Sequence, residues 1–171
     1  MITTSIILIT IAAVLLIAYT VILCAQNGIP RSLSASVFFL PRKGAWIWTA
    51  VIAAVVFALA HVLIGTAQRA QFLAFFACAG LLFVAGCPLV PDKIDMAYRV
   101  HLAAAIVCAL SAMGLVACNR PILYLLWIPW VAVFIWKTKG VSTWPTQTFW
   151  AEMMCFLITF IYAYLMAMST D

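Results

Sequence analysis

Long apolar runs separated by short polar connections make up most of this chain. A helix crosses the hydrocarbon core of a bilayer with about 20 mostly apolar residues, each rising about 1.5 Å. Six runs are long enough, and they cover residues 3–25, 45–65, 71–89, 98–118, 121–136 and 148–168. Their connections leave no room for a soluble domain. The pattern therefore predicts an all-α fold, a polytopic transmembrane bundle of six helices that forms a single domain over residues 1–171.

The composition supports the same class. The chain has 171 residues, of which 68% are hydrophobic and 8% charged, and its mean hydropathy is +1.22. A soluble domain carries about 25% charged residues, so the water-soluble globular class is excluded. Disordered chains and coiled coils are excluded as well, because they need polar or repetitive sequences.

The basic residues indicate how the chain crosses the membrane. The formal net charge is +5, and the nine Lys and Arg residues lie at or near the ends of apolar runs. The second and fourth connections hold Arg69 and Arg120, while the first, third and fifth hold Arg31, Arg42, Lys43, Lys93, Arg99, Lys137 and Lys139. Because cytoplasmic connections are enriched in Lys and Arg, we expect these three connections in the cytoplasm and both termini outside. The expected location is a bacterial inner membrane. The expected partners are membrane lipids, with a protein partner or a second copy left open, and no nucleic acid.

Two of the predicted helices have features of their own. The first apolar run lacks a preceding basic segment and is too long for a signal peptide, so we expect it to be retained as a helix. The fifth run is the shortest, lies between Arg120 and Lys137, and is interrupted by Pro129. A proline inside a helix removes a backbone hydrogen bond, so this helix is expected to be kinked.

Small residues recur at a spacing of four along the second and fourth runs, and closely along the third. Such rows let helix backbones approach in a membrane. We expect helices two, three and four to form a tightly packed centre, with a dimerisation seam as the alternative. The six cysteines form no C-x-x-C pair, so they are interpreted as small packing residues and neither as disulfides nor as a metal site. The small residues are Ala50, Ala54 and Ala58; Ala74, Cys78, Gly80 and Gly86; and Ala104, Cys108 and Ala112.

The first connection, residues 26–44, is long for a compact bundle. Pro30 and Pro41 bracket a segment in which serines alternate with apolar residues. Alternation is typical of a strand, but an isolated strand at a membrane leaves its backbone groups without partners. A short interfacial helix or a segment packed against the bundle is therefore expected, and a lid is the alternative.

Ionisable groups within a membrane are costly and mark candidate sites. His61 lies near the outer end of the second predicted helix, and His101 lies at the cytoplasmic start of the fourth. Their depths should differ by roughly 20 Å. A haem with two histidine ligands needs both at one level, so no haem or other cofactor is predicted.

A second group of polar residues gathers at the cytoplasmic end of the predicted bundle. Glu152 lies about one turn into the sixth helix, at a depth where it could meet His101 or Arg99. A buried carboxylate favours such a partner, because an uncompensated charge in lipid costs several kcal/mol. One interpretation is a polar ligand-binding pocket open to the cytosol, and the other is an ordinary capped helix start with local charge pairs. The candidate ligand-binding residues are Asp92, Asp95, Arg99, His101 and Glu152.

The sequence lacks the common motifs of soluble catalysis. It has no P-loop, no G-x-G-x-x-G, no H-E-x-x-H and no G-x-S-x-G. Ser111 and His101 are ten residues apart on one predicted helix, about 15 Å along its axis, so they cannot form a nucleophile–base pair. No catalytic residue is assigned.

Three segments carry a resemblance to other proteins. Residues 29–35 read I-P-R-S-L-S-A, residues 80–88 fit G-L-x-F-V-x-x-x-P, and Val100–His101 supply a V-H pair. Over residues 28–112 the chain resembles a set of small, uncharacterised bacterial and phage-associated membrane proteins. The arrangement of Pro91, Asp92, His101 and Ala104 is distantly similar to DRAM-like six-helix membrane proteins. The resemblance implies six helices and directs attention to Asp92 and His101, without implying a particular chemistry.

Three functions are compatible with these features. The favoured one is a non-enzymatic membrane protein that binds a small ligand or lipid, as a transport-like protein or accessory subunit with a polar site facing the cytosol. The second is a membrane-embedded enzyme that acts on a lipid head group with Asp92, His101 and Glu152 as acid–base groups. The third is a phage or defence module that assembles in the membrane.

Overall fold

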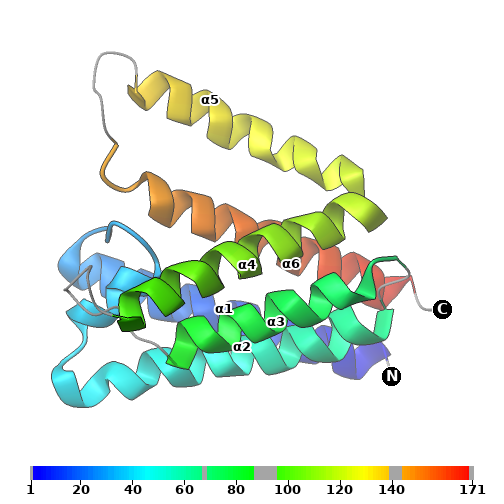
Figure 1. Ribbon diagram of the computed structural model, residues 1–171, viewed down its shortest axis with the longest axis horizontal. Helices are drawn as coiled ribbons and strands as arrows, with labels where there is room; N and C mark the ends of the chain where they lie inside the picture. Colours follow the sequence, from blue (N-terminus) through cyan, green and yellow to red (C-terminus); the bar gives the residue numbers. More distant parts are fainter. Residues whose placement is uncertain (1, 67–68, 87–95, 139–143, 170–171) are drawn as a thin grey trace.

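The computed structural model describes residues 2–66, 69–86, 96–138 and 144–169. These residues form helices and their connections, without a strand, which confirms the predicted all-α bundle (Figure 1). Three short 3-10 helices accompany the α-helices: η1 (Ser34–Phe39), η2 (Arg42–Gly44) and η3 (Pro121–Leu126). The α-helices are α1 (Ile2–Asn27), α2 (Ala45–Thr66), α3 (Gln71–Gly86), α4 (Met96–Asn119), α5 (Trp127–Thr138) and α6 (Gln147–Met168).

Among the residues that the structure describes, five apolar helical segments are long enough to cross a membrane. They are Thr3–Asn27, Ala45–Thr66, Met96–Asn119, Pro121–Thr138 and Gln147–Met168. The third predicted span corresponds to α3, whose 16 residues extend only about 24 Å. Residues 87–89, with which that span was expected to end, lie outside the described part of the chain. By length and composition, the chain is a multi-pass membrane protein.

Successive helices run in opposite directions, so the start of α1 and the end of α6 lie at the same end of the bundle (Figure 1). Hydrogen bonds join the connections at each end. The Phe149 N–H donates to the Arg31 carbonyl at 3.1 Å, which ties the first connection to the start of α6. At the other end, the Asn119 side chain accepts from the Arg69 N–H at 3.1 Å and donates to the Arg69 carbonyl at 2.9 Å. The described connections that hold Arg69 and Arg120 lie at one end of the bundle, and the first connection lies at the other, as the alternation of the predicted helices requires. The assignment of these ends to the two sides of a membrane stays a prediction.

Helices α3 and α4 approach each other closely at Gly80. A Cβ atom placed on Gly80 would lie 2.9 Å from the Ala104 carbonyl oxygen and 3.0 Å from the Cys108 nitrogen, both backbone atoms. The small residues of these two helices therefore act within the chain, as expected. In the row on α2, Ala54 and Ala58 instead line a hollow between α1 and α2.

The helix α6 belongs to the centre as well, which the small-residue pattern did not indicate. Its Ile158, Tyr162 and Ala163 have no exposed surface. By contrast, α5 buries none of its residues and diverges from α6 (Figure 1). The fifth predicted span begins as the 3-10 helix η3 and continues as α5 from Trp127, and the expected kink at Pro129 stays a prediction. Pro129 then falls in the first turn of α5, where a proline is tolerated.

The first connection packs against the bundle, which is one of the arrangements expected from the sequence. Leu33, Ser34, Ser36 and Val37 are all buried, and the segment from Ser34 forms the 3-10 helix η1. The Ser36 and Tyr19 hydroxyls share a buried hydrogen bond of 2.9 Å, which fixes η1 to α1.

Candidate functional site

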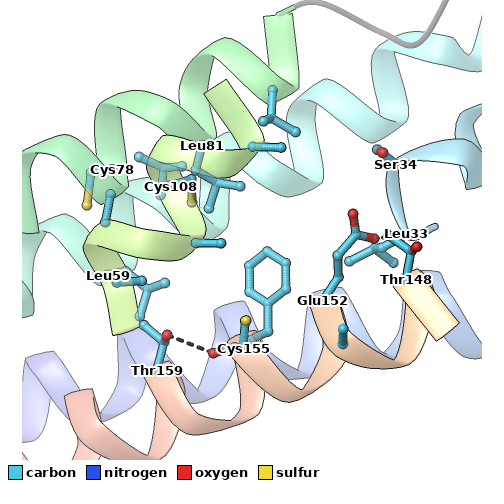
Figure 2. A pocket seen from close by; sticks show the side chains of 18 of the residues that line it. Leu33, Ser34, Leu59, Cys78, Leu81, Cys108, Thr148, Glu152, Cys155 and Thr159 are labelled. Atoms are coloured by element: carbon cyan, nitrogen blue, oxygen red, sulfur yellow. Dashed lines mark hydrogen bonds between the residues drawn. The ribbon is translucent and has the colours of Figure 1, made fainter. Parts of the chain in front are cut away.

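A cavity of about 210 Å³ lies between α2, α3, α4 and α6. Along α6 its wall extends from Thr148 to Thr159, about 16 Å. Most of the lining is aliphatic, and its polar side chains come mainly from the end of the bundle that holds the first connection (Figure 2). A largely apolar hollow with a few convergent polar groups is the usual form of a small-molecule site.

Glu152 is the only carboxyl group among the described residues of the cavity wall. It lies in the second turn of α6, and its side chain extends toward Leu33 and Ser34 of the first connection (Figure 2). One carboxylate oxygen, Oε2, accepts a hydrogen bond from the Leu33 backbone N–H. The carboxylate therefore joins two segments that are far apart in the sequence.

The local sequence explains why Leu33 offers this N–H group. Leu33 is the residue directly before η1, and the first N–H groups of a helix have no acceptor within it. The Ser32 hydroxyl accepts from the Ala35 N–H at 3.1 Å, which leaves the Leu33 N–H to a group outside the segment. Leu33 is 2% exposed, so its N–H cannot rely on water. Glu152 supplies the missing acceptor.

The carboxyl group of Glu152 has no basic neighbour among the described residues of the cavity wall. Lys, Arg and His are absent from the described wall, and Glu152 forms no ion pair within the described residues. An ionised carboxylate has about four acceptor positions, of which the Leu33 N–H occupies one. The remaining positions can bind hydrogen-bond donors or a cation.

Other polar and aromatic groups share the wall. Trp48 and Phe156 are among its lining residues, and the indole Nε1 of Trp48 is buried without a hydrogen-bond partner in the described structure. Three thiols, from Cys78, Cys108 and Cys155, come from three different helices (Figure 2). Within the described ranges, His, Cys, Asp and Glu side chains form no group suited to hold a metal ion.

Arg99 and His101, the other predicted site residues that the structure describes, do not line the cavity with Glu152. Asp92 and Asp95 lie outside the described residues. Arg99 is exposed near the start of α4, and His101 is 4% exposed but does not line the cavity. The hydrogen-bond partner of Glu152 is Leu33, whereas the sequence pattern favours His101 or Arg99. Of the three predicted site residues that the structure describes, only Glu152 reaches the cavity.

The two histidines lie at opposite ends of the bundle. His61 is exposed five residues before the end of α2, and His101 lies five residues after the start of α4. Because α2 and α4 run in the same direction, the two side chains differ in depth, as the sequence predicts. They do not share a site.

The sequence points to Glu152 as a site residue, but it does not reveal the residues that surround Glu152 in the cavity. Between Asp95 and the C-terminal Asp171, Glu152 is the only acidic residue, which singles it out. The proline-bracketed first connection was a signal that Leu33 could pack inward. Nothing in the sequence indicates that Trp48 and the three thiols meet at one cavity.

No protein-family model, curated protein or solved structure matches this chain. What it binds must therefore be inferred from the chemistry of its own side chains.

Proposed function

We propose that this protein is a non-enzymatic membrane protein that binds a small amphiphilic molecule or a lipid group in the cavity between α2, α3, α4 and α6. The observation that supports it is a carboxylate held inside an apolar cavity. Ionisable groups at membrane depth are costly, and they are kept where they contact a ligand or lie on a transport path. A transport-like protein or an accessory subunit is the corresponding role.

The position of the site suggests the route of entry. Glu152, Leu33 and Thr148 lie at the end of the bundle that carries Arg31 and Lys137. If the positive-inside rule holds in a bacterial inner membrane, this end faces the cytosol and both termini face outward. The ligand then reaches Glu152 from the cytosolic side or from the inner leaflet.

A cavity-filling substitution tests the proposal in the full-length protein. Ala109 lines the cavity, and Ala103 lies on the same helix with an exposed side chain. We expect 2-phenylethanol, an aromatic ring with one hydroxyl, to raise the melting temperature of the wild type and of Ala103→Phe. Ala109→Phe should abolish the shift, because its ring fills the cavity. A ligand that stabilises Ala109→Phe as much as Ala103→Phe, or that stabilises none of the three proteins, would contradict the proposal.

A further inference from the structure

The polar groups of the cavity also indicate which chemical class of ligand it takes. We propose that the ligand carries an ammonium group, which binds the Glu152 carboxylate while its apolar body occupies the cavity. This inference rests on the proposed binding function and makes it specific.

The first argument is charge. The cavity wall holds one carboxylate and no basic side chain among its described residues. A carboxylate in surroundings of low dielectric attracts a cation far more strongly than it does in water. A cationic ligand would compensate a negative charge on Glu152 that the described residues of the wall leave uncompensated, and an anionic ligand would be repelled.

The second argument is hydrogen-bonding capacity. Leu33 donates to Oε2 of Glu152, so most acceptor positions of the carboxylate are still available. The hydroxyl oxygens of Ser34 and Thr148 lie on the same side of the cavity as Glu152 (Figure 2). An alkylammonium group has three donors and no acceptor, which complements a group of oxygen acceptors.

The third argument comes from the aromatic wall. Trp48 and Phe156 are both among the residues that line the cavity. Ring faces attract cations, and tryptophan is the most effective of the aromatic side chains. The same rings provide apolar contact for the body of the ligand.

The volume limits the size of that body. The cavity measures about 210 Å³, somewhat more than the roughly 150 Å³ of an engineered cavity that accepts benzene. One ring or a short branched chain therefore fits inside. An ammonium of this kind could belong to a free hydrophobic amine, or to the head group of an amine-containing lipid whose acyl chains stay in the bilayer.

The test compares two ligands that differ in one group, 2-phenylethylamine and 2-phenylethanol. Melting temperatures of the full-length protein are measured in mild detergent at neutral pH. We expect the amine to stabilise the wild type more than the alcohol, with a shift on the order of 5–10 °C at 100 times its Kd. Glu152→Gln keeps an oxygen acceptor for the Leu33 N–H and removes the charge. In this variant the advantage of the amine should disappear, while the alcohol still binds and so demonstrates that the variant is folded.

Phosphatidylethanolamine and phosphatidylglycerol vesicles distinguish the two sources of the ammonium. If phosphatidylethanolamine stabilises the protein, phosphatidylglycerol does not, and the effect is lost in Glu152→Gln, the ammonium belongs to a lipid head group. If the free amine is the stabilising probe, the ammonium belongs to a small molecule. Equal shifts with amine and alcohol in the wild type would overturn the ammonium assignment and leave the binding function standing. The same holds for an amine advantage that survives in Glu152→Gln. Absence of binding by all four probes would overturn both.

Discussion

Substitution of Gly80 by alanine provides a direct test of how α3 and α4 pack. The new Cβ would lie 2.9 Å from the Ala104 carbonyl oxygen and 3.0 Å from the Cys108 nitrogen. Ordinary contacts of a Cβ begin near 3.4 Å, so the two helices must separate by about 0.5 Å. Both atoms belong to the backbone of α4 and cannot move by a side-chain rotation. Overpacking of this kind costs about 1–3 kcal/mol.

Gly65 is the matched control. It lies within a helix, and a Cβ placed on it meets nothing within 4 Å. The gain in helix propensity on replacing glycine by alanine, up to about 1 kcal/mol in a helix interior, applies to Gly80 in full and to Gly65, the second-last residue of α2, only in part. The difference between Gly80→Ala and Gly65→Ala is therefore a lower limit for the cost of the contact with α4. Gly114→Ala should fall between them, because its Cβ would meet only the flexible end of Leu73 at 3.2 Å.

The free energy of unfolding of the three variants can be measured in mixed micelles with increasing sodium dodecyl sulfate. We expect Gly80→Ala to be less stable than Gly65→Ala by about 1–3 kcal/mol. Equal stability of the two would refute the close approach of α3 and α4. Because both helices line the cavity, Gly80→Ala should also weaken ligand binding more than Gly65→Ala does.

Three further predictions concern other contacts. Tyr19→Phe should lower the free energy of unfolding by about 1–3 kcal/mol, because it leaves the buried Ser36 hydroxyl without its partner. In the same sodium dodecyl sulfate titration, the double variant Tyr19→Phe with Ser36→Ala should recover part of this loss, because it removes both hydroxyl groups. Asn119→Ala removes both hydrogen bonds to the Arg69 backbone, so amide exchange around Arg69 should become faster, as read by mass spectrometry, while exchange at the opposite end of the bundle stays unchanged. A cysteine introduced at Arg69 and one at Lys137 should react with a membrane-impermeant reagent from opposite sides of the membrane, and labelling of both from one side would contradict the bundle topology.

The lengths and order of the helices follow from the sequence because a span in lipid needs a continuous apolar run. The faces that these helices bury do not. In α4, Ala104 and Ala112 are buried while Leu110 is 69% exposed, so the small residues face inward and a large apolar one faces lipid. Hydrophobicity cannot indicate this orientation when lipid is as apolar as leucine. The rows of small residues did indicate it for α3 and α4, and they gave no sign that α6 joins the centre.

The depth of a side chain is easier to predict than its partner. The rise of about 1.5 Å per residue correctly places Glu152 near the end of the bundle where the first connection lies. Its actual partner is the backbone N–H of Leu33. Every residue except proline has such a group, so the residue type at position 33 does not reveal the contact. A search among charged side chains therefore points to His101 or Arg99, and the true contact depends on how the first connection folds against α6.

Glu152 has two roles in the proposed site. Its carboxyl oxygen accepts the hydrogen bond from the Leu33 N–H, and its negative charge would bind the ligand. A buried backbone N–H in a membrane protein requires an acceptor, so an uncharged oxygen at position 152 would satisfy the fold. The negative charge exceeds what Leu33 needs, and this excess is what a cationic ligand can use. The two roles separate in a pair of substitutions. Glu152→Ala removes the acceptor and should loosen the first connection, whereas Glu152→Gln should preserve it and lose only the preference for ammonium. If both variants lose stability alike, the charge itself holds the first connection in place, and the carboxylate is a structural element of the fold.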